Sequence, residues 1–186
     1  MTSVDVPTGP PLPSPAAALQ ARFEHILQHQ MAGVPMLNPA LQVQALGFRP
    51  WAGHWLGVLV TPWFMNLVLF PRQREQWQAI GERESRHYVF PAGVFEFIGS
   101  HDGELGDYQA CSLFSPMFEF QDHAAAHDTA VAALAALFDP ALRPVSDAPA
   151  ATDEPRAEAM PSAPAKPALS KRDFLFGGNA RGPREP

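Results

Sequence analysis

Proline sets the limits of what this chain can fold into, because it donates no backbone hydrogen bond and interrupts both helices and sheets. Of the 21 prolines, five lie in residues 7–15 and nine in residues 140–186. Only seven are left for the long middle of the chain, which can therefore hold regular secondary structure. The sequence predicts a disordered arm at 1–15, a folded domain at 16–139, a disordered Ala/Pro linker at 140–169 and a tail at 170–186.

The charge of the chain changes along a similar boundary. Residues 1–139 carry 13 acidic residues and 6 arginines, whereas residues 140–186 carry 6 acidic and 7 basic residues. An acidic domain does not suit nucleic acid, whose phosphates require a positive surface. It suits a basic peptide, or the basic end of the chain itself. We therefore expect a protein partner and no nucleic acid.

Neither the first residues nor the apolar segments indicate a membrane protein. The chain starts with polar residues and is then rich in proline, unlike a signal peptide. The longest apolar run, residues 55–70, is short for a membrane span and is interrupted by Pro62 and Asn66. A single cysteine, Cys111, excludes a disulfide within the chain. These features predict a soluble cytoplasmic protein without stable membrane insertion.

The apolar pattern predicts a single α+β domain, with a mostly antiparallel sheet, an N-terminal helix and a C-terminal helix. Helical spacing marks residues 16–31 and 122–138, and each helix is expected to bury one stripe. The stripe of the first helix consists of Leu19, Phe23, Ile26, Leu27 and Gln30, and that of the second consists of Ala124, Val131, Leu134, Ala135 and Phe138. Strands are predicted at 42–48, 54–60, 66–70, 94–98 and 107–115, with one or two helical turns at 73–80. The last two strands flank a loop at 100–106 that contains Asp-Gly, which is typical of a hairpin.

Three segments of these strands, at 55–60, 66–70 and 94–98, are apolar on both of their alternating faces. A sheet with one face in water alternates apolar with polar residues instead. Both faces must therefore be covered. The helices and loops of the domain itself are the first candidates, and the tail, a second copy of the chain or a bound protein are the alternatives.

Few residues are arranged for catalysis or metal binding. Cys111 lies in an apolar strand without a base at a suitable spacing, so we interpret it as a buried hydrophobe. Two histidine pairs, His25/His29 and His123/His127, have the i, i+4 spacing of metal ligands on a helix. Neither pair has a carboxylate or thiolate placed to complete a site. We therefore expect no metal site, no cofactor and no enzymatic activity.

Acidic residues around the predicted hairpin are candidates for binding a basic partner. Glu96 lies inside an apolar strand, where an unpaired carboxylate is costly to bury. The neighbouring loop adds Asp102, Glu104 and Asp107. A solvated turn is one interpretation of the loop acids, and a receptor for an arginine pair is the other.

The tail contains a short motif within an Ala/Pro-rich region. Residues 170–175 read Ser-Lys-Arg-Asp-Phe-Leu, which resembles a twin-arginine export signal with its serine, basic pair, variable residue and Phe-Leu. The residues that carry the motif are Lys171, Arg172, Phe174 and Leu175. A signal at this end cannot start export, but a protein that binds such signals could use a copy of one. The alternative is an apolar segment that simply adds to the sheet or the core.

Two segments of the domain resemble the HybE/HupJ family of [NiFe]-hydrogenase assembly chaperones. They are VTPWFMNLVLFP at 60–71, and GVFEF at 93–97 followed by YQACSLFSPM at 108–117. The basic pair and Phe-Leu-Phe-Gly of the tail are also similar to the C-terminus of that family. The resemblance implies a small α+β accessory protein for maturing the iron–sulfur small subunit, which is exported by the twin-arginine route. It implies no iron in this chain, which lacks the cysteines of the rubredoxin fused to some relatives.

The resemblance leads to a hypothesis of function. The chain is expected to be a cytoplasmic chaperone that binds the twin-arginine-targeted small-subunit precursor, with other maturation proteins as further partners. The predicted client-binding residues are Trp63, Phe64 and Met65 for the Phe-Leu of the signal, and Glu96, Asp102, Glu104 and Asp107 for its basic pair. The tail would occupy the same groove at rest. The alternatives are a redox or metal-handling accessory protein that aids iron–sulfur cluster formation in oxygen, and a scaffold for other maturation factors.

Overall fold

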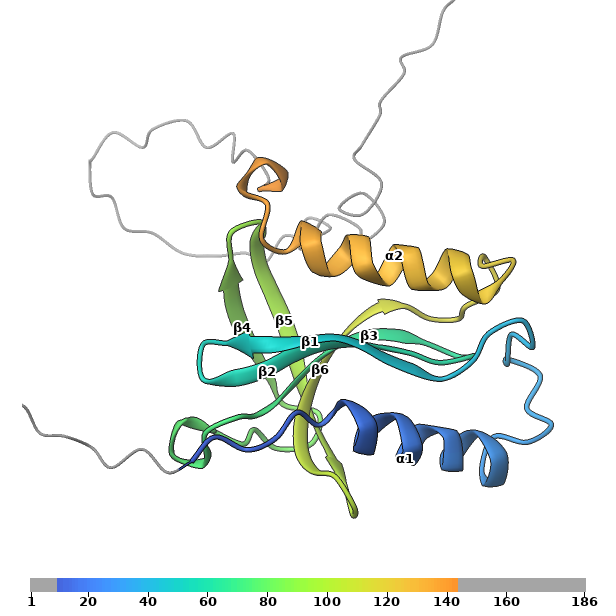
Figure 1. The fold of residues 1–186 in the computed structure, drawn as a ribbon, viewed down its shortest axis with the longest axis horizontal. Helices are drawn as coiled ribbons and strands as arrows, with labels where there is room; N and C mark the ends of the chain where they lie inside the picture. The colour runs from blue at the N-terminus through green and yellow to red at the C-terminus, as the bar shows by residue number, and fades with distance from the viewer. Residues whose placement is uncertain (1–9, 144–186) are drawn as a thin grey trace, which may run out of the picture.

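The structure, a computed structural model, describes residues 10–143 and consists of one sheet with a helix on each face (Figure 1). The helices are α1 (Ala16–His29) and α2 (His123–Ala136), with two short 3-10 helices, η1 (Arg74–Gln76) and η2 (Pro140–Leu142). The strands are β1 (Gln44–Trp51), β2 (His54–Val60), β3 (Met65–Pro71), β4 (Ser85–Phe90), β5 (Gly93–Asp102) and β6 (Gly106–Phe114). The predicted α+β fold is confirmed.

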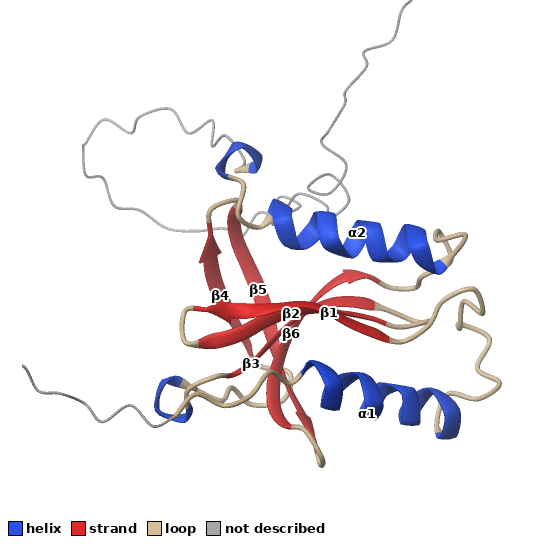
Figure 2. Ribbon diagram, in the orientation of Figure 1, coloured by secondary structure: helices blue, strands red, loops and turns tan. Residues whose placement is uncertain are grey.

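The strand order brings β6 back beside β3 and carries the β4–β5 hairpin to one end of the sheet. The order is β1-β2-β3-β6-β5-β4, and all five pairs of named strands are antiparallel. β5 pairs with β6 only from Ile98 onward, whereas Gly93–Phe97 pair with β4 alone among the named strands. Figure 2 shows the consequence, since the β4–β5 hairpin stands at a steep angle to β1, β2 and β3.

α1 covers one face of the sheet with the stripe that its spacing predicts. Leu19 is fully buried and Phe23 nearly so, and the helix ends a little before Gly33, which has a φ of 76°. The apolar residues that they meet on this face are Val43, Leu59, Val68 and Phe70. The register of the helical pattern thus places α1 over β1, β2 and β3.

α2 covers the opposite face, but largely with other residues than those predicted. The carboxylate of Asp122 caps the helix by accepting a hydrogen bond from the Ala125 N–H at 2.8 Å. The buried residues of the helix are Ala126, Ala130, Ala133 and Leu134. Val131, which was predicted to be buried, is 48 % exposed, and Ala124 and Ala135 are exposed as well. A helix rich in alanine has little contrast between its faces, so the sheet it packs on decides which methyl groups are buried.

Several predicted element boundaries are corrected by the structure. The helical turns predicted at 73–80 reduce to the single turn of η1, and the strand predicted at 94–98 extends to Asp102. β4 was not predicted, because its first three residues are polar or charged and it follows a highly charged segment. The hairpin between the last two predicted strands is confirmed, with a shorter loop. Within residues 10–143 no helix is long and apolar enough to cross a membrane.

The described residues cover both faces of the central strands but only one side of β5 in the hairpin. Every residue from Leu56 to Val60 in β2 and from Leu67 to Phe70 in β3 is buried, because α1 and α2 cover the two faces. In β5, Phe97 is fully buried on one side, but Val94 and Ile98 on the other side are 62 % and 48 % exposed. The domain therefore leaves one apolar sheet surface uncovered by its described residues.

Candidate binding surface

The uncovered surface is one side of the β4–β5 hairpin. Successive residues of a strand point to opposite sides, and on this hairpin one side packs on the core while the other is exposed. We call the exposed set the hairpin face, which consists of Ser85, His87, Val89, Val94, Glu96 and Ile98. Val89 is 67 % exposed and lies opposite the exposed Val94, and Ile98 lies on the same side beyond Glu96. Exposed apolar residues grouped in this way are typical of a surface that binds another polypeptide.

Glu96 lies at the centre of the hairpin face. It is flanked by Val94 and Ile98 along β5 and lies opposite His87 of β4. Its side chain is exposed and takes part in none of the ion pairs formed within residues 10–143. A carboxylate in this setting can receive a cation from a partner, while the residues beside it receive apolar side chains. An open hollow of about 380 Å³ continues this surface past Ile98 toward His101 and Tyr108.

The hairpin face adjoins a free strand edge. Among the described residues β4 pairs only with β5, and its register has no bulge. Alternate residues of such a strand direct their N–H and C=O groups away from the sheet. The opposite edge, β1, is protected by a bulge between Leu46 and Arg49 and by Pro50. Proteins commonly protect an edge in this way, so the unprotected edge of β4 is a surface at which a further strand can be added.

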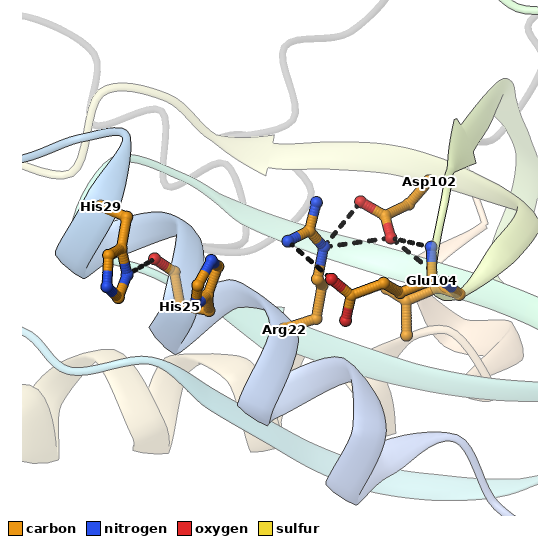
Figure 3. Close-up of polar contacts among 6 residues, drawn as sticks. Arg22, His25, His29, Asp102 and Glu104 are labelled. Atoms are coloured by element: carbon orange, nitrogen blue, oxygen red, sulfur yellow. Dashed lines mark hydrogen bonds and ion pairs between the residues drawn. The ribbon is translucent and has the colours of Figure 1, made fainter.

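Asp102 and Glu104, two of the predicted client-binding residues, are already engaged by an arginine of the chain itself (Figure 3). Arg22 of α1 donates from Nε to both oxygens of Asp102, at 2.9 and 3.1 Å, and contacts Glu104 Oε1 at 3.2 Å. Burial disfavours the ionised form of Asp102. The hydrogen bonds from the Glu104 N–H, Arg22 and the Leu105 N–H outweigh burial and hold the pKa of Asp102 below its ordinary value.

We expect Asp102→Asn to lower the free energy of unfolding at pH 7 by about 1–2 kcal/mol, the usual value of hydrogen bonds to a charged group. Because the folded-state pKa lies below the unfolded value of 3.8, this stabilisation is present above pH 3.8 and is lost as the pH falls through the folded-state pKa. Urea unfolding at pH 7 and pH 2.5 measures it. The control Glu104→Gln, at a side chain that is 70 % exposed, should change little. An equal loss for Asp102→Asn at both pH values would contradict the prediction.

Asp107 is paired as well. Its Oδ1 lies 2.7 Å from Nδ1 of His101, and both side chains are about half exposed. The hydrogen bond to Asp107 is the main cause that raises the pKa of His101. A client arginine would have to compete with this histidine for the carboxylate.

The three apolar residues predicted for the groove lie elsewhere. Trp63 and Phe64 are partly buried and pack against Phe23 of α1, with ring centroids 6.3 and 5.8 Å away. Met65 is fully buried in the core on the α2 side. The prediction that Met65 contacts a client is therefore corrected, because the strand alternation turns it into the core. The seven predicted residues do not form one groove, and Glu96 alone of them belongs to the hairpin face.

Cys111 is buried, and the two histidine pairs contact other side chains of the domain or each other. Cys111 is 2 % exposed within the α2-side core. His25 and His29 stack on the exposed side of α1 at 4.1 Å between ring centroids. His123 and His127 both contact the side-chain oxygen of Gln44, at 3.1 and 3.0 Å. Residues 10–143 contain no group of three or more His, Cys, Asp or Glu side chains arranged to hold a metal ion.

Sequence reasoning missed the half of the hairpin face that β4 provides, because it did not predict this strand. The signal was present in the six residues Ser-Arg-His-Tyr-Val-Phe at 85–90, where Tyr88 and Phe90 alternate with more exposed positions. The two residues Pro91 and Ala92 that follow are a tight connection to β5. The tail motif at 170–175, with Lys171, Arg172, Phe174 and Leu175, lies outside the described residues.

The fold and this surface are those of a small α+β protein with a sheet surface suited to binding another polypeptide. The chain belongs to the family described as [NiFe]-hydrogenase assembly, chaperone, HybE, whose family profile matches residues 14–177. The resemblance stated from the sequence is thereby confirmed. The matched range extends beyond the described residues and ends at Gly177, directly after the tail motif.

The names of proteins similar to this chain are consistent with this family. A hydrogenase expression/formation protein HupJ from Bradyrhizobium diazoefficiens is 45 % identical over 66 % of this chain and 71 % of its own length. Protein HoxT from Cupriavidus necator is 37 % identical over 86 % of each chain. A protein named probable rubredoxin HupJ, from Rhodobacter capsulatus, is 40 % identical over 70 % of this chain, which spans only 47 % of that protein. The solution structure of HybE from Escherichia coli has the same fold, with a TM-score of 0.57 at 24 % identity over 85 % of this chain and 96 % of that one.

Proposed function

We propose that this protein is a cytoplasmic chaperone, and not an enzyme, that binds the twin-arginine-targeted precursor of the small subunit of a [NiFe]-hydrogenase. The hairpin face and the free edge of β4 are the surface for the signal segment. The observation that carries this assignment is an exposed carboxylate, Glu96, between two exposed apolar side chains beside an unprotected strand edge.

The chemistry of the surface matches that of a twin-arginine signal. Such a segment has two adjacent basic residues followed closely by apolar ones. As an added strand it would form backbone hydrogen bonds to β4 and direct alternate side chains onto the hairpin face. Its side chains lie directly beside Ser85, His87 and Val89 of β4, so an arginine reaches Glu96 across His87 while an apolar side chain meets Val89.

This placement differs from the one expected from the sequence. Asp102 and Glu104 are held by Arg22, and a client that used them would have to break that ion pair. Trp63 and Phe64 support α1 through Phe23. Glu96 needs no such rearrangement, so the proposed surface centres on β4 and β5.

Charge reversal at Glu96 is the direct test. Titration calorimetry with a chain that ends at Leu169, which keeps every described residue and lacks the tail motif, measures the affinity for a synthetic peptide containing Ser-Arg-Arg-x-Phe-Leu. Glu96→Lys should weaken binding by about tenfold or more, because an attractive charge contact worth roughly 1.4 kcal/mol becomes repulsive. The variant should unfold at the same urea concentration as the original protein, since the side chain is exposed.

Asp128→Lys, at an exposed position of α2, is the matched control and makes the same charge change away from β4 and β5. It should reduce the affinity at most slightly, through the net charge of the domain. Equal weakening by both variants would show that net charge, and not the hairpin face, attracts the peptide. A peptide that does not bind even the unsubstituted shortened chain would overturn the proposed function.

A further inference from the structure

We infer that residues 170–177 of this chain dock along the free edge of β4 and cover the hairpin face, as a strand that a client segment must displace. Displacement by a client rests on the proposed function, whereas the docking itself does not. The inference combines the place where the described chain ends, the length of chain beyond it, and the match between the tail sequence and the surface.

The described chain ends beside the hairpin. The Ala92 N–H, in the turn between β4 and β5, donates to the Leu137 carbonyl at 3.1 Å. The ring of Phe138 lies 5.9 Å from that of Phe90. Figure 1 shows η2 next to the ends of β4 and β5. The chain beyond Arg143 therefore starts at the tip of the hairpin whose face is uncovered.

The length of chain that follows is sufficient. Twenty-six residues, 144–169, separate Arg143 from Ser170. A coil of that length has a root-mean-square span of roughly 25–30 Å. A six-residue strand is about 20 Å long, so every position along β4 is within reach. Such a connection gives a local tail concentration on the order of 1 mM, which favours docking of even a weak segment.

The tail sequence fits the hairpin face in one of its two possible orientations. In an extended strand Arg172, Phe174 and Phe176 share one side, so a cation is followed by two aromatic rings. With Arg172 at the level of Glu96, Phe174 lies at the level of Ile98 in one strand direction and of Val89 and Val94 in the other, so the hairpin face receives the cation and one ring. The other side of the tail strand carries Lys171, Asp173 and Leu175, and it would bring an anion near Glu96 and less apolar surface. The side with Arg172 therefore fits better.

Amide hydrogen exchange at β4 tests the docking. We compare the full chain with a chain that ends at Leu169, and with the full-length double variant Phe174→Ser/Phe176→Ser. If the tail binds with a dissociation constant on the order of 0.1 mM, a local concentration near 1 mM occupies the edge roughly tenfold over the free state. Amides on the outer edge of Ser85–Phe90 should then exchange about tenfold faster in both variants. Met160→Ser, a similar loss of apolar surface outside the motif, should leave them unchanged.

The other outcomes would overturn the inference. Equal exchange at β4 in the full and shortened chains means that the tail does not dock there. Global unfolding of both tail variants means that the tail is part of the core and not a displaceable strand. Protection that increases with protein concentration assigns the edge to a second copy of the chain.

The signal peptide distinguishes this inference from the proposed function. If both hold, the shortened chain binds the peptide about tenfold more tightly than the full chain, because no tail competes. Faster exchange at β4 without any peptide binding would leave the docking established and overturn the function. If both chains bind the peptide equally and exchange at β4 is the same in both, the docking is overturned and the proposed function stands.

Discussion

Truncating Phe97 to alanine should lower the free energy of unfolding by about 3–5 kcal/mol, the usual cost of removing a buried phenylalanine ring. Phe97 is fully buried on the inner side of β5, where it meets Tyr88 edge-on at 5.5 Å and Phe90 at 6.3 Å. Because folded domains are stable by only about 5–15 kcal/mol, this is a large share of the total. The urea midpoint of unfolding measures it.

Ile98→Ser, at the next residue of the same strand, is the matched control. Its side chain is 48 % exposed on the hairpin face, so in a chain that ends at Leu169 the loss of stability should stay below about 1 kcal/mol. Its affinity for the signal peptide should fall, since the residue borders Glu96. A large loss of stability for Ile98→Ser in that chain would show that something other than the tail covers the hairpin face. A small loss for Phe97→Ala would contradict the packing of the hairpin on the core.

Asn38→Ala is expected to be the most damaging change outside the apolar core, at about 2–3 kcal/mol. The Asn38 side chain is 7 % exposed and donates from Nδ2 to the carbonyls of Met117 and Phe120, at 3.0 and 2.7 Å. Its Oδ1 accepts from the Ala40 N–H at 3.0 Å. One side chain thus joins the segment before β1 to the segment before α2, and alanine leaves buried backbone groups without partners. Thermal and urea unfolding both measure the loss.

Asn38→Asp separates the two roles of this side chain. Aspartate keeps an acceptor for the Ala40 N–H but replaces the donor by an oxygen that faces two carbonyls. It should therefore be at least as destabilised as the alanine variant at neutral pH, and should recover in part on acidification, when the carboxyl group carries a proton. An aspartate variant as stable as the original protein would exclude the two carbonyl contacts as a source of stability.

The surface we assign to client binding is largely independent of what stabilises the domain. The hairpin is anchored from its inner side, where the Tyr88 hydroxyl also donates to the buried Gln109 side chain at 2.8 Å. Its outer side has exposed residues whose replacement costs little stability. Binding can therefore be altered by substitutions such as Glu96→Lys without unfolding the protein, which makes the proposed function accessible to experiment.

Local sequence patterns were sufficient for the helices, for the central strands and for the family resemblance. Apolar residues at helical spacing predicted α1 and its buried stripe, and strands apolar on both faces predicted that β2 and β3 would be enclosed. These properties are visible in sequence because they depend on residues within a few positions of one another. The same patterns could not select the buried side of α2, whose alanines are too alike to differ in preference.

The arrangement of the candidate surface depended on contacts between distant parts of the chain. Arg22 engages Asp102 across 80 residues, and Asn38 contacts Phe120 across 82. The local periodicity of a sequence does not indicate which residues meet at such separations. Likewise, the insertion of β6 between β3 and β5 moves the β4–β5 hairpin to the end of the sheet, beyond the cover of α1. The composition of β5 showed that its apolar side chains needed covering. Which of them the domain itself would cover was decided by strand order, because burial is a property of the assembled layers and not of the strand.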